Sequence, residues 1–246
     1  MNIASRVHRR IRLAATAAKT GAEAVRRDDM GVDFWALHRQ VSPYTQTSPE
    51  RLFALREAVH HIAVAAIPGD VVECGVWRGG SSMMAALAMR EARDLRRLWL
   101  FDTFEGMPKP GEYDRDLTGV DSKIEYERRH AEEGGWNYAS LQDVQANMAR
   151  IGYDDSLLTF VKGLVEETIP ATSPERIALL RLDTDFYEST RHELLHLWPR
   201  LAPGGVLIID DYGHFEGARK AIDEFFADEP TLLSRIDYTG RLAIKR

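Results

Sequence analysis

Closely spaced aspartates are the residues of this sequence best suited to chemistry. Asp183 and Asp185 follow one apolar run, and Asp210 and Asp211 follow another. Each run predicts a buried strand, and neighbouring parallel strands bring the residues at their ends together at one edge of a sheet. Three carboxylates that meet there repel one another unless a cation neutralises them, and oxygen ligands favour Mg²⁺, Ca²⁺ or Mn²⁺. We therefore predict a metal site made of Asp183, Asp210 and Asp211, the alternative being that Asp210 or Asp211 only caps a turn.

Asp185 has a different predicted role. It stands two residues after Asp183, so both carboxylates project to the same side if the strand continues. One can hold the metal while Asp185 acts as the general base that takes a proton from a hydroxyl. The alternative is that Asp185 caps the helix that begins near Tyr187. His130, which lies in a long insertion, is a reserve candidate for the base.

Two earlier strand ends carry residues suited to an adenosine-type ligand with a charged amino-acid tail. Glycines follow the first strand, at Gly75 and again from Gly79, and let a ligand approach the backbone and the start of the next helix. Glu73 suits an ammonium group, and Asp102, at the end of the second strand, suits a ribose diol. The glycine spacing is not that of a dinucleotide site. A purely structural glycine turn and a helix cap at Asp102 are the alternatives.

The elements that position these residues alternate between strand and helix patterns, which implies a mostly parallel sheet covered on both faces. A closing pair of short strands at the C-terminus adds antiparallel pairing at one edge. Strands are predicted at 70–76, 97–102, 157–162, 177–183, 206–209, 232–238 and 241–245, and helices at about 49–68, 82–93, 141–151, 187–201 and 217–227.

Two segments depart from this rhythm. About 37 residues between Thr103 and Leu141 are rich in Gly, Asp, Glu, Arg and Tyr, and a connection of that length is usually functional. We interpret it as a lid over the cleft, the alternative being a disordered surface loop. Residues 1–28 are rich in arginine and alanine, which fits a transit peptide, an anion-binding helix, or a helix that packs loosely or crosses to a partner subunit.

Composition narrows the class of protein. The 246 residues are 44% hydrophobic and 28% charged, near globular averages, and the net charge of −6 gives no basic field for nucleic acid. A single cysteine, Cys74, excludes an intramolecular disulfide, so we expect a cytoplasmic protein. No apolar run is long enough to predict a membrane span.

Taken together, these motifs resemble the macrocin O-methyltransferase family, whose members use S-adenosylmethionine and Mg²⁺ to methylate sugar hydroxyls in macrolide and aminocoumarin antibiotic biosynthesis. The resemblance covers roughly residues 41–246 and rests on motifs that occur in the family's order. They are Thr45–Arg51, Glu73–Ser81, Phe101–Pro108, Leu182–Thr190 and Asp210–Gly213.

The resemblance implies an α/β class I methyltransferase with a Rossmann-like fold, a mostly parallel seven-stranded sheet and a C-terminal antiparallel hairpin. Residues 1–40 would be a helical arm, and residues 41–246 the methyltransferase domain with a lid at about 104–140. It also implies Asp183, Asp210 and Asp211 as Mg²⁺ ligands and Asp185 as the base. The implied S-adenosylmethionine-binding residues are Thr45, Glu73, Gly75, Gly80, Ser81, Ser82, Asp102, Phe104 and Gly163.

The implied acceptor is a glycosylated small molecule, and the resemblance is weakest there. The family usually has glycine where Thr184 stands and leucine where Phe186 stands, so Thr184 would narrow the acceptor site or restrict its backbone. A phenol or catechol methyltransferase and a non-catalytic cofactor-binding protein are the alternative functions. We expect a homo-oligomer, a dimer or larger, with neither nucleic acid nor membrane as partner.

Overall fold

The computed structural model describes residues 29–246, so the predictions for the arm at residues 1–28 fall outside the described part of the chain. Residues 29–41 are helical. Contacts divide the chain into two compact units at Gln40 and Val41, and the fold described below is that of Val41–Arg246. No helix of the described residues is long and apolar enough to cross a membrane.

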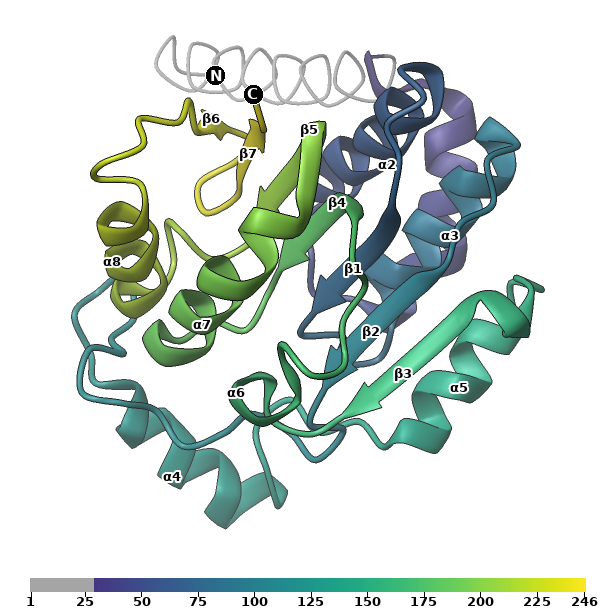
Figure 1. The fold of residues 1–246 in the computed structure, drawn as a ribbon. Helices are drawn as coiled ribbons and strands as arrows, with labels where there is room; N and C mark the ends of the chain where they lie inside the picture. The colour runs from purple at the N-terminus through teal and green to yellow at the C-terminus, as the bar shows by residue number, and fades with distance from the viewer. Residues whose placement is uncertain (1–28) are drawn as a thin grey trace, which may run out of the picture. The chain divides into compact units, whose positions relative to one another are not determined.

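A seven-stranded sheet forms the centre of this unit, in the order β3-β2-β1-β4-β5-β7-β6 (Figure 1). The pairs among β1 to β5 are parallel, and β7 runs antiparallel to both β5 and β6. This confirms the predicted parallel sheet with an antiparallel C-terminal hairpin. The strands are β1 (Asp70–Cys74), β2 (Leu98–Asp102), β3 (Leu158–Lys162), β4 (Ile177–Leu182), β5 (Leu201–Ile209), β6 (Ser234–Arg235) and β7 (Arg241–Ile244).

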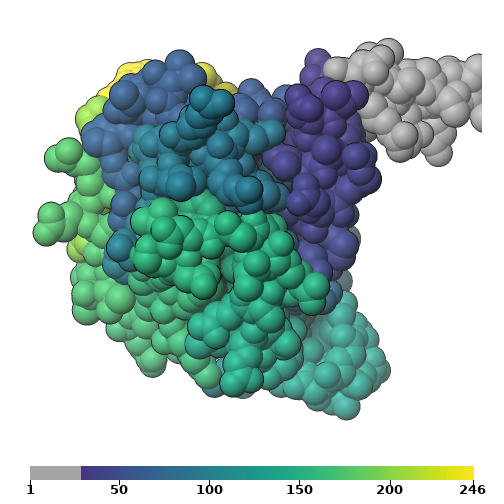
Figure 2. All heavy atoms as spheres, turned by 90° about the vertical axis from the view of Figure 1, so that its right-hand side faces the viewer, coloured from purple at the N-terminus to yellow at the C-terminus, as the bar shows by residue number. Residues whose placement is uncertain are grey.

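Helices cover both faces of the sheet, as alternating elements require. One face carries α2 (Pro49–Val64), α3 (Gly80–Ala92) and α5 (Leu141–Ala149), whose side chains make a continuous surface in Figure 2. The other carries α6 (Val165–Thr168), α7 (Tyr187–Leu197) and α8 (Glu216–Phe225). Short 3₁₀ turns lie at η1 (Ser42–Tyr44), η2 (Asp155–Leu157) and η3 (Trp198–Arg200). Strand β4 is buried along its whole length, as a central parallel strand must be.

Strand β5 begins earlier than its sequence predicts. Pro203, Gly204 and Gly205 indicate a turn, yet the strand already starts at Leu201. The pairing with β4 shifts between Ile177 and Leu179, so Pro203, Gly204 and Gly205 lie in an irregular stretch of the ladder. Proline and glycine are tolerated within a strand at such a bulge, which explains the difference.

The insertion after β2 is folded, and it contains a helix that its sequence did not predict, α4 (Ser122–Glu133). The first half of the insertion is fixed to the domain by Asp114. This residue is 1% exposed and accepts hydrogen bonds from the backbone N–H groups of Gly111 and Tyr187. A β-bridge joins Asp116 to Phe215 at the start of α8. The insertion therefore contacts the elements that follow β4 and β5.

Candidate active site

A cavity of about 480 Å³ opens at the carboxyl ends of the parallel strands. Residues that follow β1, β2, β3, β4 and β5 line it, together with the segment before α2, the insertion and the tip of the C-terminal hairpin. This is the position at which open α/β sheets bind ligands. Of the predicted site residues, it is lined by Thr45, Gly75, Ser81, Asp102, Gly163, Asp183, Asp185, Asp210 and Asp211.

Three carboxylates in this cavity form a compact cluster. Asp183, Asp185 and Asp211 each offer an oxygen, and these oxygens lie within 4.8 Å of one another. Asp211 Oδ2 is buried and has no hydrogen-bond partner within residues 29–246. Burial, followed by the charges of Asp185 and Asp183, raises the pKa of Asp211 well above its usual range. An oxygen cluster with an unpartnered buried atom fits a hard divalent cation, so these residues suit Mg²⁺.

Asp185 reaches this cluster through a turn and not through continued alternation of the strand. Strand β4 ends at Leu182, and Asp185 has φ of 67°, a left-handed conformation that is uncommon outside glycine. Burial, with a further contribution from Asp183, raises the pKa of Asp185 to about 7. A carboxyl group with such a pKa suits a general base near neutral pH. Its backbone conformation is of the kind that concentrates at functional sites.

The capping alternatives find no support in the geometry. The N–H of Tyr187, at the start of α7, donates to Asp114 from the insertion and not to Asp185. Within residues 29–246, neither Asp210 nor Asp211 accepts a side-chain hydrogen bond from a following backbone N–H. The side chains of Asp185, Asp210 and Asp211 therefore do not serve as caps.

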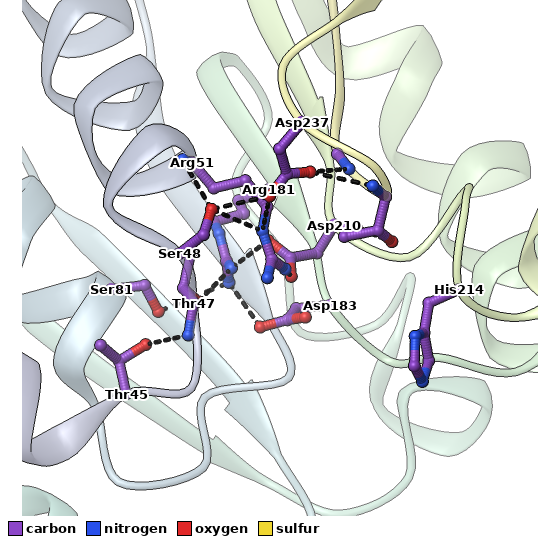
Figure 3. Close-up of polar contacts among 12 residues, drawn as sticks. Thr45, Thr47, Ser48, Arg51, Ser81, Arg181, Asp183, Asp210, His214 and Asp237 are labelled. Carbon is purple, nitrogen blue, oxygen red and sulfur yellow. Dashed lines mark hydrogen bonds and ion pairs between the residues drawn. The ribbon is translucent and has the colours of Figure 1, made fainter. Parts of the chain in front are cut away.

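Asp210 lies between two arginines. It is 2% exposed, and its two oxygens accept hydrogen bonds from Arg51 and from Arg181 (Figure 3). The predicted ligand set of Asp183, Asp210 and Asp211 is thus arranged differently here, with Asp185 and not Asp210 completing the cluster of oxygens. Asp210 is still in reach of the cavity, which it lines.

Arg181 is the centre of the polar network beneath the cavity (Figure 3). Its Nη1 lies 2.6 Å from Glu73 Oε1 and 2.7 Å from Asp183 Oδ2, and its Nη2 donates to Thr47 Oγ1 at 3.0 Å. Burial by itself would lower the pKa of the guanidinium, but Asp183 and Glu73 outweigh it and raise the pKa. Paired in this way, the 2% exposed side chain holds carboxylates of two neighbouring strands in fixed positions.

Glu73 does not line the cavity. It is 3% exposed and accepts hydrogen bonds from Ser81 Oγ, at 2.6 Å, and from Ser82 Oγ in the first turn of α3. Burial raises its pKa, while Arg181 and the two serines oppose this. The geometry therefore lets Glu73 orient Ser81, which does face the cavity.

Three other residues predicted to bind the cofactor also lie outside the lining: Gly80, Ser82 and Phe104. A Cβ at Gly80 would meet Tyr44 and Thr45 at 2.6 to 2.7 Å, so glycine lets the segment before α2 pack on α3. Phe104 is 2% exposed and packs near Phe160. Their contacts in the structure are with the protein itself.

Asp102 fixes the loop that begins the site. Its Oδ2 accepts hydrogen bonds from the N–H groups of Val76 and Trp77, at 2.7 and 2.9 Å, and its Oδ1 accepts one from Phe104. No helix follows it directly, so the predicted alternative of a helix cap does not apply. Gly75 is required at the same place, because a Cβ there would collide with the carbonyl oxygen of Asp183.

Thr184 fits its position without backbone strain. Unlike Asp185, it does not adopt a left-handed conformation. Its Oγ1 donates to Glu193 Oε2 at 3.1 Å, and Glu193 is fully buried on α7. Burial raises the pKa of Glu193 well above its usual range. A threonine between the two aspartates is thus tied to the helix that follows.

Several residues of the cavity wall were not predicted from the sequence, among them Trp136, His214 and Tyr238. None has a motif of its own, and only the folding of the insertion and hairpin brings them to the cavity. His130, the reserve base, does not line it. It is exposed on α4, and its Nδ1 lies 2.8 Å from the carbonyl oxygen of Tyr126.

Comparisons with known proteins show which family this chain resembles. The profile of the macrocin-O-methyltransferase (TylF) family matches residues 3–243. A rhamnosyl-tetracenomycin C 4'-O-methyltransferase of Streptomyces olivaceus is 38% identical over 80% of this chain and 74% of its own. The mycinamicin III 3''-O-methyltransferase of Micromonospora griseorubida is 36% identical over 74% and 70%.

A third relative and two solved structures extend the comparison. The demethyldecarbamoylnovobiocin O-methyltransferase of Streptomyces niveus is 34% identical over 75% of this chain and 68% of its own. The structure of the O-methyltransferase NovP superposes with a TM-score of 0.73 at 32% identity, covering 82% of each chain. The calicheamicin methyltransferase CalS11 shares the fold, with a TM-score of 0.59 at 22% identity over 78% of this chain and 77% of its own. The chain is an O-methyltransferase that belongs to the macrocin-O-methyltransferase (TylF) family.

Proposed function

We propose that this chain transfers a methyl group from S-adenosylmethionine to a sugar hydroxyl of a glycosylated natural product, with Mg²⁺ as metal cofactor. The observation that carries the proposal is that one cavity joins the strand ends predicted to bind the cofactor to the cluster of Asp183, Asp185 and Asp211. The three named relatives act on glycosylated antibiotic intermediates or on novobiocin precursors.

The proposed roles follow from position in the cavity. Ser81, at the start of α3, and Asp102, at the end of β2, would bind the amino-acid tail and the ribose, and Gly163 would lie on the adenine side. Thr45, on the segment before α2, lines the cavity and would close over this half of it. Glu73 would act through Ser81, whose hydroxyl it holds.

At the other half, Asp183 and Asp211 would hold Mg²⁺, with Asp210 as the third predicted ligand. When bound, the ion neutralises these carboxylates and makes a nearby alcohol easier to deprotonate. Asp185 takes the proton of the acceptor hydroxyl, whose oxygen forms the new bond to the methyl carbon as the carbon–sulfur bond breaks. Positioning of the two reactants supplies much of the acceleration.

The proposal is tested by methyl transfer from labelled S-adenosylmethionine to glycosylated acceptors. The panel contains the acceptors named for the three relatives and a catechol as the phenolic alternative. We expect transfer to at least one glycosylated acceptor, no transfer to the catechol, and loss of transfer in excess EDTA that Mg²⁺ restores. Full activity in EDTA would exclude the metal role, and transfer to the catechol alone would favour the phenol methyltransferase.

A further inference from the structure

His214 and Tyr238 form part of the cavity wall and have no role in the chemistry described so far. His214 follows Asp211 by three residues, and its backbone N–H donates to the carbonyl oxygen of Asp211 at 3.0 Å. Both side chains line the cavity. In Figure 3 the ring of His214 stands apart from the arginine network, on the loop after β5.

The hairpin tip that carries Tyr238 is fixed to this loop by several contacts. The N–H of Gly213 donates to the carbonyl oxygen of Thr239 at 3.0 Å, and Thr239 Oγ1 donates to the carbonyl oxygen of Asp210 at 2.8 Å. A Cβ at Gly213 would collide with the carbonyl oxygen of Tyr238, so glycine is needed for this approach. The segment after the metal-side aspartates and the hairpin tip therefore form one wall.

Within this wall the imidazole of His214 is hydrogen-bonded through one of its two ring nitrogens, Nδ1. Tyr238 Oη lies 3.2 Å from His214 Nδ1, and the ring of Phe215 contacts that of His214 edge to face at 4.7 Å between centroids. Within residues 29–246, no hydrogen bond is made by His214 Nε2. Tyr238 is 54% exposed and His214 is half-buried, so a ligand can reach both.

We propose that His214 binds the acceptor: Tyr238 holds its Nδ1, and its Nε2 hydrogen-bonds an oxygen of the acceptor sugar beside Asp185 and Asp211. This inference rests on the proposed function, since it names the residue that receives the sugar in that cavity. An imidazole fixed through one nitrogen presents the other as a single directed donor or acceptor. A sugar offers oxygens in several directions, so this contact selects which hydroxyl faces the carboxylates.

The test measures binding of methyl α-L-rhamnopyranoside to the full chain with Mg²⁺ and S-adenosylhomocysteine present, followed by NMR with ¹⁵N-labelled histidine. We expect the rhamnoside to shift the Nε2 resonance of His214 and His214→Phe to bind it about tenfold more weakly, as loss of one hydrogen bond predicts. Tyr238→Phe keeps the ring and should weaken binding about threefold, because it removes only the group that orients the imidazole.

His130→Phe is the matched control, since this histidine lies outside the cavity, and it should bind the rhamnoside like the wild type. Affinity for S-adenosylhomocysteine should stay unchanged in every variant, which excludes general misfolding. With a glycosylated acceptor that is methylated, His214→Phe should raise KM and leave kcat nearly unchanged, as expected for a contact made equally in the ground and transition states.

The role of His214 is overturned if the rhamnoside does not bind, if it binds without shifting the His214 resonance, or if His214→Phe binds it as well as wild type. These outcomes are separate from the fate of the proposed function. If the rhamnoside binds through His214 but no glycosylated acceptor is methylated, the proposed function fails while the binding role stands.

Discussion

Asp185 combines a left-handed backbone conformation with a carboxyl pKa that burial raises to about 7. The left-handed conformation costs conformational energy. The raised pKa means that the charged form of Asp185 is disfavoured within a cluster of like charges. A residue that only ended a strand would need neither. At the scale of single residues, these are the strongest structural arguments for Asp185 as the base.

Replacement of Asp185 by asparagine, assayed at saturating Mg²⁺, tests this role. Asparagine tolerates the left-handed conformation and keeps the size of the side chain, so the turn should survive. Since asparagine cannot accept the proton, we expect kcat to fall by a factor on the order of 100 or more. Steady-state methyl transfer measures this, and binding of S-adenosylmethionine by calorimetry should remain near the wild-type value. Near-normal turnover would remove Asp185 from the mechanism.

Asp211 should act in metal binding and not in cofactor binding. Its unpartnered Oδ2 is buried beside the carboxylate cluster, and within residues 29–246 no hydrogen bond links its side chain to Ser81 or Asp102. We expect Asp211→Asn to weaken Mg²⁺ binding and to lower activity on the order of 100-fold, with little change in affinity for S-adenosylmethionine. Asp155→Asn, an exposed aspartate on η2, is the matched control. Equal loss of metal and cofactor affinity would instead indicate a disrupted fold.

Among elements, the close approach of the ends of β1 and β4 decides where the site forms. Gly75 has φ of 83°, and a Cβ there would collide with the backbone of Asp183. Without this glycine, the loop that carries the predicted cofactor residues and the turn that carries the aspartates could not lie side by side. The same contact joins the two halves of the cavity.

Gly75→Ala should therefore be far more damaging than a glycine substitution of equal backbone cost. Gly119, in the insertion, has φ of 82° and nothing within 4 Å of its missing Cβ, so Gly119→Ala supplies that control. We expect the control to lose about 1 to 2 kcal/mol of unfolding free energy from backbone strain, and Gly75→Ala to lose several kcal/mol more because backbone must move. Chemical denaturation measures both, and equal losses would contradict the collision.

Much of the element order was predictable because hydrophobic patterns report burial directly. The predicted ends of β2 and β5 agree with the structure, and β4 ends at Leu182, one residue before its predicted end, since an apolar run that stops at a carboxylate marks where the core ends. The pairing of β4 with β5 followed from the parallel topology. Helix α4 was missed because it buries only Ser122, and a helix without an apolar stripe gives no periodic signal.

The inner network was less predictable, because its partners are distant in sequence. Arg181 lies within an apolar strand, and its sequence position gives no sign that it will meet Glu73, which is 108 residues away. Asp237 likewise binds Ser48 and Arg51, at 2.7 and 3.0 Å, only once the hairpin has folded back. Such contacts depend on tertiary structure, and local spacing carries no signal for them.

For the molecule as a whole, the carboxylate cluster couples stability to pH and to metal. The pKa of Asp185 is raised from 3.8 to about 7, so between these values the native state binds more protons than the unfolded state. Stability contributed by this group is therefore present at low pH and is lost as pH rises through about 7. A cation that binds only the native state opposes this loss, and it does so best where protons no longer compete.

Thermal unfolding of wild type and Asp185→Asn, with and without Mg²⁺, tests this coupling. Because the variant lacks the titrating carboxyl, its melting temperature should exceed that of metal-free wild type by a few degrees near pH 8, a difference that shrinks towards pH 4. Added Mg²⁺ should raise the melting temperature of wild type more near pH 8 than near pH 5, and that of the variant by less. If the melting temperatures of the two proteins change in parallel with pH, Asp185 does not titrate in this range. If Mg²⁺ raises the melting temperature of wild type equally at both pH values, the ion binds away from the cluster.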